Sequence, residues 1–197
     1  MHAHPRMKRQ ILTSLRMLLV MTLLTGVLYP LIMTVAAQLL FPRQSNGSVM
    51  SSDRGIVGSE LLAQRFHSDK YFWGRPSAAG YDPLPSGADN LGPTSRALLD
   101  SAEKRRVEFT EKNRLPPGTE VPPEMLFASG SGLDPHISPE AAYLQIDRIV
   151  RARALGARGG DALTELVGRH IEEPQFGFLG ERRVNVLLLN LSLDSLK

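Results

Sequence analysis

The longest apolar segment of the chain lies near its N-terminus. Between Arg16 and Arg43 there are 26 residues without a charged side chain, most of them Leu, Val, Met, Ile, Ala or Phe. As a helix rising about 1.5 Å per residue, this segment can cross a hydrocarbon core of roughly 30 Å. We therefore predict a transmembrane helix over residues 17–41. A signal peptide cleaved near Ala37 is the alternative, but its apolar region would span only about 7–15 residues.

The charges on either side of this segment predict its orientation. Four basic residues and no acidic residue precede it, whereas Arg43 follows it and the next acid is Asp53. The positive-inside rule then places residues 1–16 in the cytoplasm. Residues 42–58 are small, polar and glycine-bearing, which indicates a linker. Residues 59–197 are expected to form an extracytoplasmic domain.

Helical periodicity recurs in the C-terminal part of the chain. Ser59 is a candidate cap for a short helix over ELLAQRF, and residues 95–113 form a charged pattern with one thin apolar side. From Pro139 onward, apolar residues at spacings of three and four predict a helix that ends near Gly156. Asp161 is a candidate cap for the next helix.

The last apolar run has a different period. In RVNVLLLNLSLDSL, Leu187, Leu189, Leu191 and Leu193 alternate with polar residues, which predicts a strand with one buried face. Together with the helices, this pattern indicates an α+β domain in which helices pack on a small sheet.

Residues 71–95 combine aromatic side chains with four prolines and with glycines, which excludes a long helix or strand. Tyr71, Phe72, Trp73 and Tyr81 provide apolar area that can anchor such a loop in a core. The alternative is a surface that docks on a partner, where Trp, Tyr and Arg are enriched. The candidates for docking are Tyr71, Phe72, Trp73, Arg75 and, on the charged side of the helix after Pro139, Arg148.

The stretch SGSGLDPHISPEAA, residues 129–142, concentrates residues that occur in active sites. It departs from the Gly-x-Ser-x-Gly pattern of a serine hydrolase, and no Gly-Lys pair occurs in the chain for a phosphate loop. Asp134 and His136 could begin a metal site, with His67 and His170 as further candidates whose spacing gives no support. We keep Asp134 and His136 as candidates for partner docking.

The end of the same stretch predicts the start of a helix. Ser138 is a preferred N-cap, Pro139 suits the first helical position, and Glu140 is favoured near the positive end of the helix dipole. We therefore assign these three residues a structural role.

Composition excludes some classes of function. The chain has no cysteine, which excludes thiol chemistry and thiolate metal sites. Residues 1–43 carry five basic groups and no acidic group, which leaves 18 basic against 20 acidic residues in the rest. The domain beyond the anchor therefore lacks the excess of basic residues that nucleic-acid binding requires.

Several long blocks resemble one known family over almost the whole chain, from about Leu15 to Leu196. They include LLTGVLYPL, YFWGRPSAAGYDPLPSGADNLGPT, VPPEMLFASGSGLDPHISPEAAYLQIDRIVRAR and VNVLLLNLSLDSL. These blocks are similar to the C subunit of the Kdp-type potassium-transporting ATPase. The resemblance implies a non-catalytic subunit of a bacterial inner-membrane complex that imports potassium at the expense of ATP.

The resemblance also implies partners and an activity at the level of the complex. The partners would be a channel-like subunit and a P-type ATPase subunit, and the family is described as a catalytic chaperone that raises the ATP affinity of the pump. A single helix cannot form a potassium pore, and Asp69-Lys70-Tyr71-Phe72 lacks the Asp-Lys-Thr-Gly of a P-type pump. ATP and potassium are therefore expected at the complex, with no cofactor bound directly by this chain.

Within the membrane helix, Gly26, Tyr29 and Pro30 are expected to allow close packing on the channel-like subunit and a local bend. Packing against lipid alone is the alternative. At the level of the whole protein, two other functions remain open: a membrane-anchored extracytoplasmic hydrolase that uses Asp134 and His136, and an envelope binding domain outside any complex.

Overall fold

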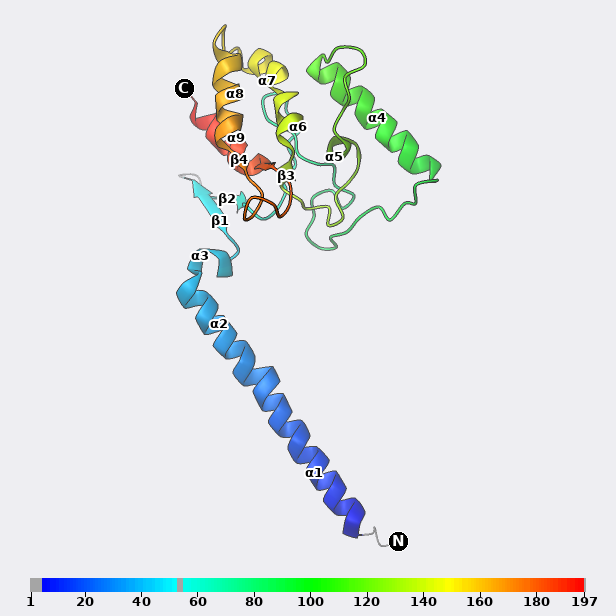
Figure 1. Ribbon diagram of the computed structural model, residues 1–197, viewed down its shortest axis with the longest axis vertical. Coiled ribbons are helices and arrows are strands. Elements are labelled where there is room, and N and C mark those ends of the chain that lie inside the picture. The colour runs from blue at the N-terminus through cyan, green and yellow to red at the C-terminus, as the bar shows by residue number, and fades with distance from the viewer. Residues whose placement is uncertain (1–4, 53–54, 197) are drawn as a thin grey trace. The chain divides into compact units, whose positions relative to one another are not determined.

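The computed structural model describes residues 5–52 and 55–196 (Figure 1). It divides the chain into two compact units, one up to Val49 and the other from Met50 onward.

The N-terminal unit is a long apolar helix. It comprises α1 (Pro5–Met21), a π-helical segment η1 (Thr22–Leu28) and α2 (Tyr29–Leu40), followed by the short helix α3 (Pro42–Ser45). Among the described residues, the span Arg6–Leu40 is the one helix long and apolar enough to cross a membrane. Its most apolar window has no buried residue in the protein itself, as expected of a helix that lipid or a partner would surround.

The π-helical segment lies directly before Pro30. Proline has no N–H to donate, and its ring would collide with the carbonyl of Gly26 in a regular α-helix. Widening the turn relieves this conflict, and the N–H of Tyr29 donates to the carbonyl of Leu24, five residues earlier. The sequence predicted a local bend at these residues, and the structure shows a π-helical distortion there.

The C-terminal unit contains two small sheets and six helices among the described residues. Strands β1 (Val49–Ser52) and β2 (Gly55–Ser59) pair with each other, and a three-stranded sheet has the order β3-β5-β4. Its strands are β3 (His136–Ile137), β4 (Ile171–Glu172) and β5 (Arg183–Asn185). The helices are α4 (Arg96–Asn113), α5 (Pro123–Leu126), α6 (Pro139–Tyr143), α7 (Ile146–Arg153), α8 (Gly159–Arg169) and α9 (Val186–Ser195).

The three-stranded sheet joins segments that are far apart in the chain. Both of its pairings are antiparallel, and Val184 of the central strand lies opposite Ile137 on one side and Ile171 on the other. Val184 is fully buried, and α6 and α9 pack close to β5. In Figure 1, α6 to α9 gather near this sheet, and α4 reaches the group through its contact with α7. The predicted α+β class is confirmed.

The segment after Ser59 was predicted to be a helix, and this prediction is wrong. The hydroxyl of Ser59 accepts a hydrogen bond from the N–H of Leu61, which closes a turn instead of capping a helix. The N–H of Ala63 then donates to the distant carbonyl of Leu133 at 2.9 Å. Long-range pairing thus outweighs the helical pattern of ELLAQRF.

The C-terminal segment was predicted to be a strand, and only its first three residues are one. Asn185 ends β5 and caps α9, because its side chain accepts from the N–H of Leu188. Leucine is a strong helix former, and the buried residues Val186, Leu189 and Leu193 lie three and four residues apart, which is helical spacing. The period of two was therefore ambiguous.

The helix predicted after Pro139 is two helices with a break at residues 144–145. The spacing of three and four put Tyr143, Ile146, Val150 and Ala154 on one apolar face. Ile146 is buried and Val150 packs against the core, but Tyr143 and Ala154 are exposed, and the buried residues also include Ala141, Ala142 and Ile149. The next helix, α8, begins two residues before the predicted cap. Asp161 lies in its first turn, where a carboxylate favours the helix dipole without capping.

Candidate functional site

Arg148 of α7 lies inside the domain, although the sequence suggested a solvent-facing position. Only 2% of the residue is exposed. Its guanidinium donates to the backbone carbonyls of Asp69 at 2.7 Å and Tyr71 at 3.0 Å. It also donates to the side-chain oxygens of Asn113 and Gln145. Burial lowers the pKa of Arg148 to about 10, so the side chain remains charged at neutral pH.

Gln145, at the break between α6 and α7, binds the backbone of Trp73 on both sides. Its amide oxygen accepts from the N–H of Trp73 at 2.8 Å, and its amide nitrogen donates to the carbonyl of Trp73 at 3.1 Å. The guanidinium of Arg148 also stacks over the Trp73 ring at 4.0 Å. The irregular backbone around Trp73 is thus paired by side chains rather than by a neighbouring strand.

Asn190 of α9 repeats this arrangement one residue earlier in the loop. Its oxygen accepts from the N–H of Phe72 at 2.8 Å, and its nitrogen donates to the carbonyl of Phe72 at 2.9 Å. Both Asn190 and Phe72 are buried. Since an unpaired backbone group in a core is costly, Gln145, Asn190 and Arg148 together allow the loop to enter the core without secondary structure.

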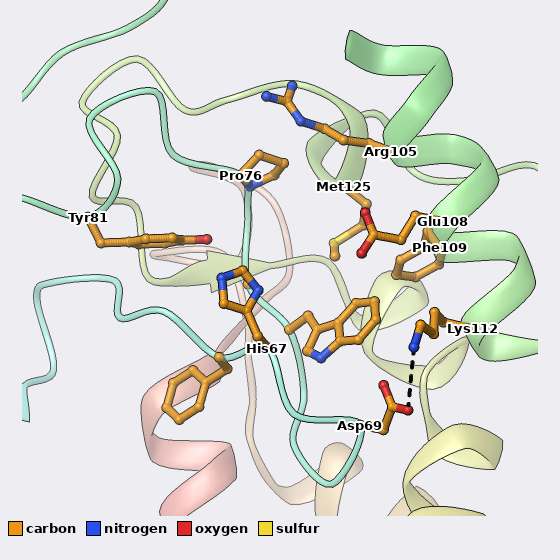
Figure 2. A pocket seen from close by; sticks show the side chains of 12 residues that line it. His67, Asp69, Pro76, Tyr81, Arg105, Glu108, Phe109, Lys112 and Met125 are labelled. Atoms are coloured by element: carbon orange, nitrogen blue, oxygen red, sulfur yellow. Dashed lines mark ion pairs between the residues drawn. The ribbon is translucent and has the colours of Figure 1, made fainter.

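A cleft lies between this anchored loop and α4, with a volume of about 450 Å³ (Figure 2). The loop contributes aromatic walls from Trp73 and Tyr81, and Asp69 and Lys112 approach across the cleft at 3.9 Å. The side chains that α4 contributes are Arg105, Glu108, Phe109 and Lys112. Aromatic walls beside charged groups of both signs are typical of surfaces that bind proteins.

A second hollow, of about 530 Å³, is lined by Arg75, Asp134 and His136. We call these three residues the Asp134 cluster. One carboxylate oxygen of Asp134 accepts from Arg75 at 2.8 Å, and the other lies 3.3 Å from Nδ1 of His136. The backbone N–H of His136 also donates to Asp134 at 3.0 Å. The sequence thus selected residues that do lie together.

Hydrogen bonds and charge interactions stabilise the ionised carboxylate of Asp134 in this cluster. Burial raises the pKa of Asp134, but the hydrogen bonds from the side chain and backbone of His136 and from Arg75 outweigh this effect and lower it to about 2. The carboxylate is therefore a poor proton donor or acceptor near neutral pH. Among the described residues, no serine hydroxyl is a hydrogen-bond partner of the His136 ring. This geometry suits a structural clamp between the 71–95 loop and β3.

The low pKa of Asp134 gives a testable pH dependence. The pKa of Asp134 in the folded protein lies below the unfolded value of 3.8. The ionised carboxylate therefore stabilises the fold above pH 4, and this contribution is lost as the pH falls towards 2. We expect Asp134→Asn to lower the free energy of unfolding by about 1–2 kcal/mol at pH 7, allowing for partial solvent screening. The difference should shrink at pH 3, as measured by urea unfolding. Asp147→Asn, at an exposed position, is the control, and an equal loss at both pH values would contradict the assignment.

The helix start predicted directly after the Asp134 cluster in the chain has the expected geometry. Ser138 is the N-cap of α6, and its hydroxyl accepts from the N–H of Ala141 at 3.1 Å. Pro139 and Glu140 occupy the first turn. The N–H of Ser138 donates to Glu124, which ties this helix start to α5.

Comparison with known proteins shows what the chain is related to. The family model described as KdpC, the c chain of K+-transporting ATPase, matches residues 11–195. The chain belongs to the KdpC family. The potassium-transporting ATPase KdpC subunit of Methylococcus capsulatus is 52% identical over 188 residues, which cover 93% of this chain and 96% of that protein. The KdpC subunits of Leptospira interrogans and Geobacter sulfurreducens are 47% and 44% identical, and each match covers more than 90% of both chains.

The burial of the docking candidates decides which of them could contact a partner. Phe72 is fully buried and Arg148 is nearly so, and both are tied to other parts of the domain. Neither can contact a partner while the domain is folded, so the docking prediction is wrong for these two residues. Tyr71 and Trp73 are half-buried, and the hydroxyl of Tyr71 donates to Asp194. These two residues, with the Asp134 cluster, remain docking candidates.

Two sets of residues escaped the sequence analysis. The first is the polar group Asn113, Gln145 and Asn190, of which Asn190 was visible as a single amide within an apolar run. The second is the segment PQFGFLG, residues 174–180, whose phenylalanines are highly exposed. Two aromatic residues around a glycine in a turn-forming segment were the available signal.

Proposed function

We propose that this chain is a non-catalytic accessory subunit of an ATP-driven potassium import complex. Its partners would be a channel-like subunit and a P-type ATPase subunit. The observation that carries this proposal is the match over more than 90% of both chains to proteins named as KdpC subunits of the potassium-transporting ATPase. The anchored loop with its cleft agrees with a binding role, because the polar side chains of the core are engaged in holding backbone rather than facing a substrate.

The proposed topology follows the charge asymmetry of the membrane helix. The N-terminal residues would lie in the cytoplasm and the C-terminal unit outside the bacterial inner membrane. In that arrangement the folded domain does not meet cytoplasmic ATP. We propose that any increase in ATP affinity is indirect: the subunit favours one conformation of the complex, and this conformation binds ATP more tightly at the pump subunit.

Gly26 offers a test of the anchor. A Cβ added at Gly26 would meet one neighbour outside its local backbone, the Thr22 side chain at an ordinary distance of 3.9 Å. A larger residue is therefore tolerated by the helix itself but would obstruct a partner helix packed there. We expect Gly26→Leu to reduce the amount of this subunit that co-purifies with the complex in detergent by at least about 10-fold, or about 1.4 kcal/mol. The complex that has lost this subunit should then show a higher apparent KM for ATP.

The matched control is Val27→Leu, which adds bulk at the next position of the same helix. It should leave both co-purification and the KM for ATP unchanged. If Gly26→Leu behaves like Val27→Leu, the helix does not pack through Gly26. If the unaltered chain purifies without a channel-like or ATPase subunit, the proposed function itself is wrong.

A further inference from the structure

The connection between β4 and β5 exposes an apolar tip. Phe176, Phe178 and Leu179, which we call the apolar tip, are 86%, 75% and 50% exposed. Two rings that would each bury roughly 150–250 Å² present on the order of a few hundred Å² of apolar surface. That is the size of the largest apolar patch on a typical monomer, which is often functional.

The apolar tip is ordered by its own backbone. Gln175 and Leu179 exchange two hydrogen bonds of 2.9 Å, and the N–H of Gly177 donates to the carbonyl of Pro174 at 3.0 Å. Phe176 has a φ of 56°, a left-handed conformation that is uncommon and strained for an aromatic residue. A tight loop would be formed at lower cost with Asn or Gly at this position. The fold therefore maintains an exposed phenylalanine there against local preference.

The base of the hairpin is also fixed. Arg183 and Glu172 pair across the two strands at 2.9 Å, and Arg182 pairs with Glu173 at 2.9 Å. Beyond them, Val184 is fully buried at the centre of the three-stranded sheet. The apolar tip is thus joined to a strand at the centre of the core, and a tip that is already folded loses less entropy when it binds a partner.

The charges next to the apolar tip favour a protein partner over a lipid surface. The residues that flank the apolar tip, 171–173 and 181–183, form its stem. The stem carries three carboxylates, Glu172, Glu173 and Glu181, and its two arginines are already paired. Elements that lie on anionic lipid carry unpaired Lys or Arg beside their apolar residues, and interfacial belts use Trp and Tyr. The stem offers neither unpaired basic residues nor Trp and Tyr. Exposed aromatic side chains surrounded by polar groups instead resemble the centre of a protein interface.

We propose that the apolar tip is a docking element that inserts Phe176 and Phe178 into an apolar recess of a neighbouring protein subunit of the same membrane complex. This inference rests on the proposed function and adds the contact that holds the domain on its partner. The Asp134 cluster and Leu179 of the tip line the same hollow. A docked subunit would therefore cover the residues that the sequence first singled out.

The direct test places a photo-crosslinker, p-benzoylphenylalanine, at position 178 of the full chain in the native membrane. We expect an adduct with a protein subunit that co-purifies with the chain. The control carries the same group at Leu84, which is 84% exposed on another loop, and should give at least about 10-fold less of that adduct. Adducts with lipid alone would show that the apolar tip meets the bilayer and would overturn the proposal, as would equal yields at the two positions.

A second measurement uses the double variant Phe176→Ser/Phe178→Ser in the assembled complex. Both side chains are exposed, so we expect unchanged Trp73 fluorescence and unfolding but at least about 10-fold less chain retained with the complex. Normal retention would overturn the docking role of the tip while leaving the accessory function intact. Failure of the unaltered chain to co-purify with any ATPase subunit would instead overturn the proposed function.

Discussion

Replacement of Arg148 by alanine is expected to lower the free energy of unfolding by about 3–5 kcal/mol. The carbonyls of Asp69 and Tyr71 would lose their donor in a buried environment, and Asn113 and Gln145 would each lose a hydrogen-bond partner. The Trp73 ring would lose the cation stacked over it at 4.0 Å. Since Trp73 is the single tryptophan of the sequence, its fluorescence during urea unfolding of the full chain in detergent measures the effect directly.

Arg151→Ala is the matched control, because Arg151 belongs to the same helix and its side chain is exposed. Its guanidinium makes one long hydrogen bond, 3.3 Å to the carbonyl of Lys112, so we expect a change of about 0.5 kcal/mol or less. Arg148→Lys should recover only part of the loss, because an ammonium group cannot reproduce the planar fork of donors. An Arg148→Ala variant as stable as Arg151→Ala would show that the buried network does not hold the loop.

The membrane helix and the fold class were accessible from the sequence because they depend on local pattern. An uncharged run of 26 residues leaves few alternatives to a spanning helix, and Ser138-Pro139-Glu140 combines three independent preferences for a helix start. The C-terminal segment was not accessible in the same way. Its leucines satisfy both a period of two and helical spacing, and the cap at Asn185 decided between them.

The polar core was beyond pattern analysis for a different reason. Arg148 follows Asp147 on a charged stretch and is indistinguishable in sequence from the exposed Arg151. Its role depends on carbonyl groups almost 80 residues earlier in the chain, which meet it only in the folded domain. Residues 71–95 form no strand in the structure, so side chains satisfy much of the loop's buried backbone, but the sequence does not show which ones.

The exposure of the apolar tip could not be predicted from the sequence either. Hydrophobic residues in a sequence are expected in the core, and Phe176 and Phe178 could not be distinguished by composition from Phe72. The structure separates them completely, with Phe72 fully buried and the two tip residues exposed. Phe72 therefore anchors the 71–95 loop, whereas Phe176 and Phe178 are available to a partner.

This division predicts opposite outcomes for two alanine substitutions. Phe72→Ala removes a ring that is 0% exposed, and we expect it to lower the free energy of unfolding by about 3–5 kcal/mol through lost burial and the cavity left behind. The two hydrogen bonds between its backbone and Asn190 should hold the cavity open, because they fix the loop in place. Thermal and urea unfolding of the full chain in detergent, followed by Trp73 fluorescence, would measure this loss.

Phe178→Ala is the matched control, with the same chemical change at a position that is 75% exposed. It should shift the free energy of unfolding by no more than about 0.5 kcal/mol and should instead weaken retention in the complex. Phe72→Leu should be intermediate in stability, because it keeps most of the apolar volume. If Phe72→Ala left stability unchanged and weakened retention instead, Phe72 would face a partner rather than the core. The anchoring role of the aromatic loop would then have to be abandoned.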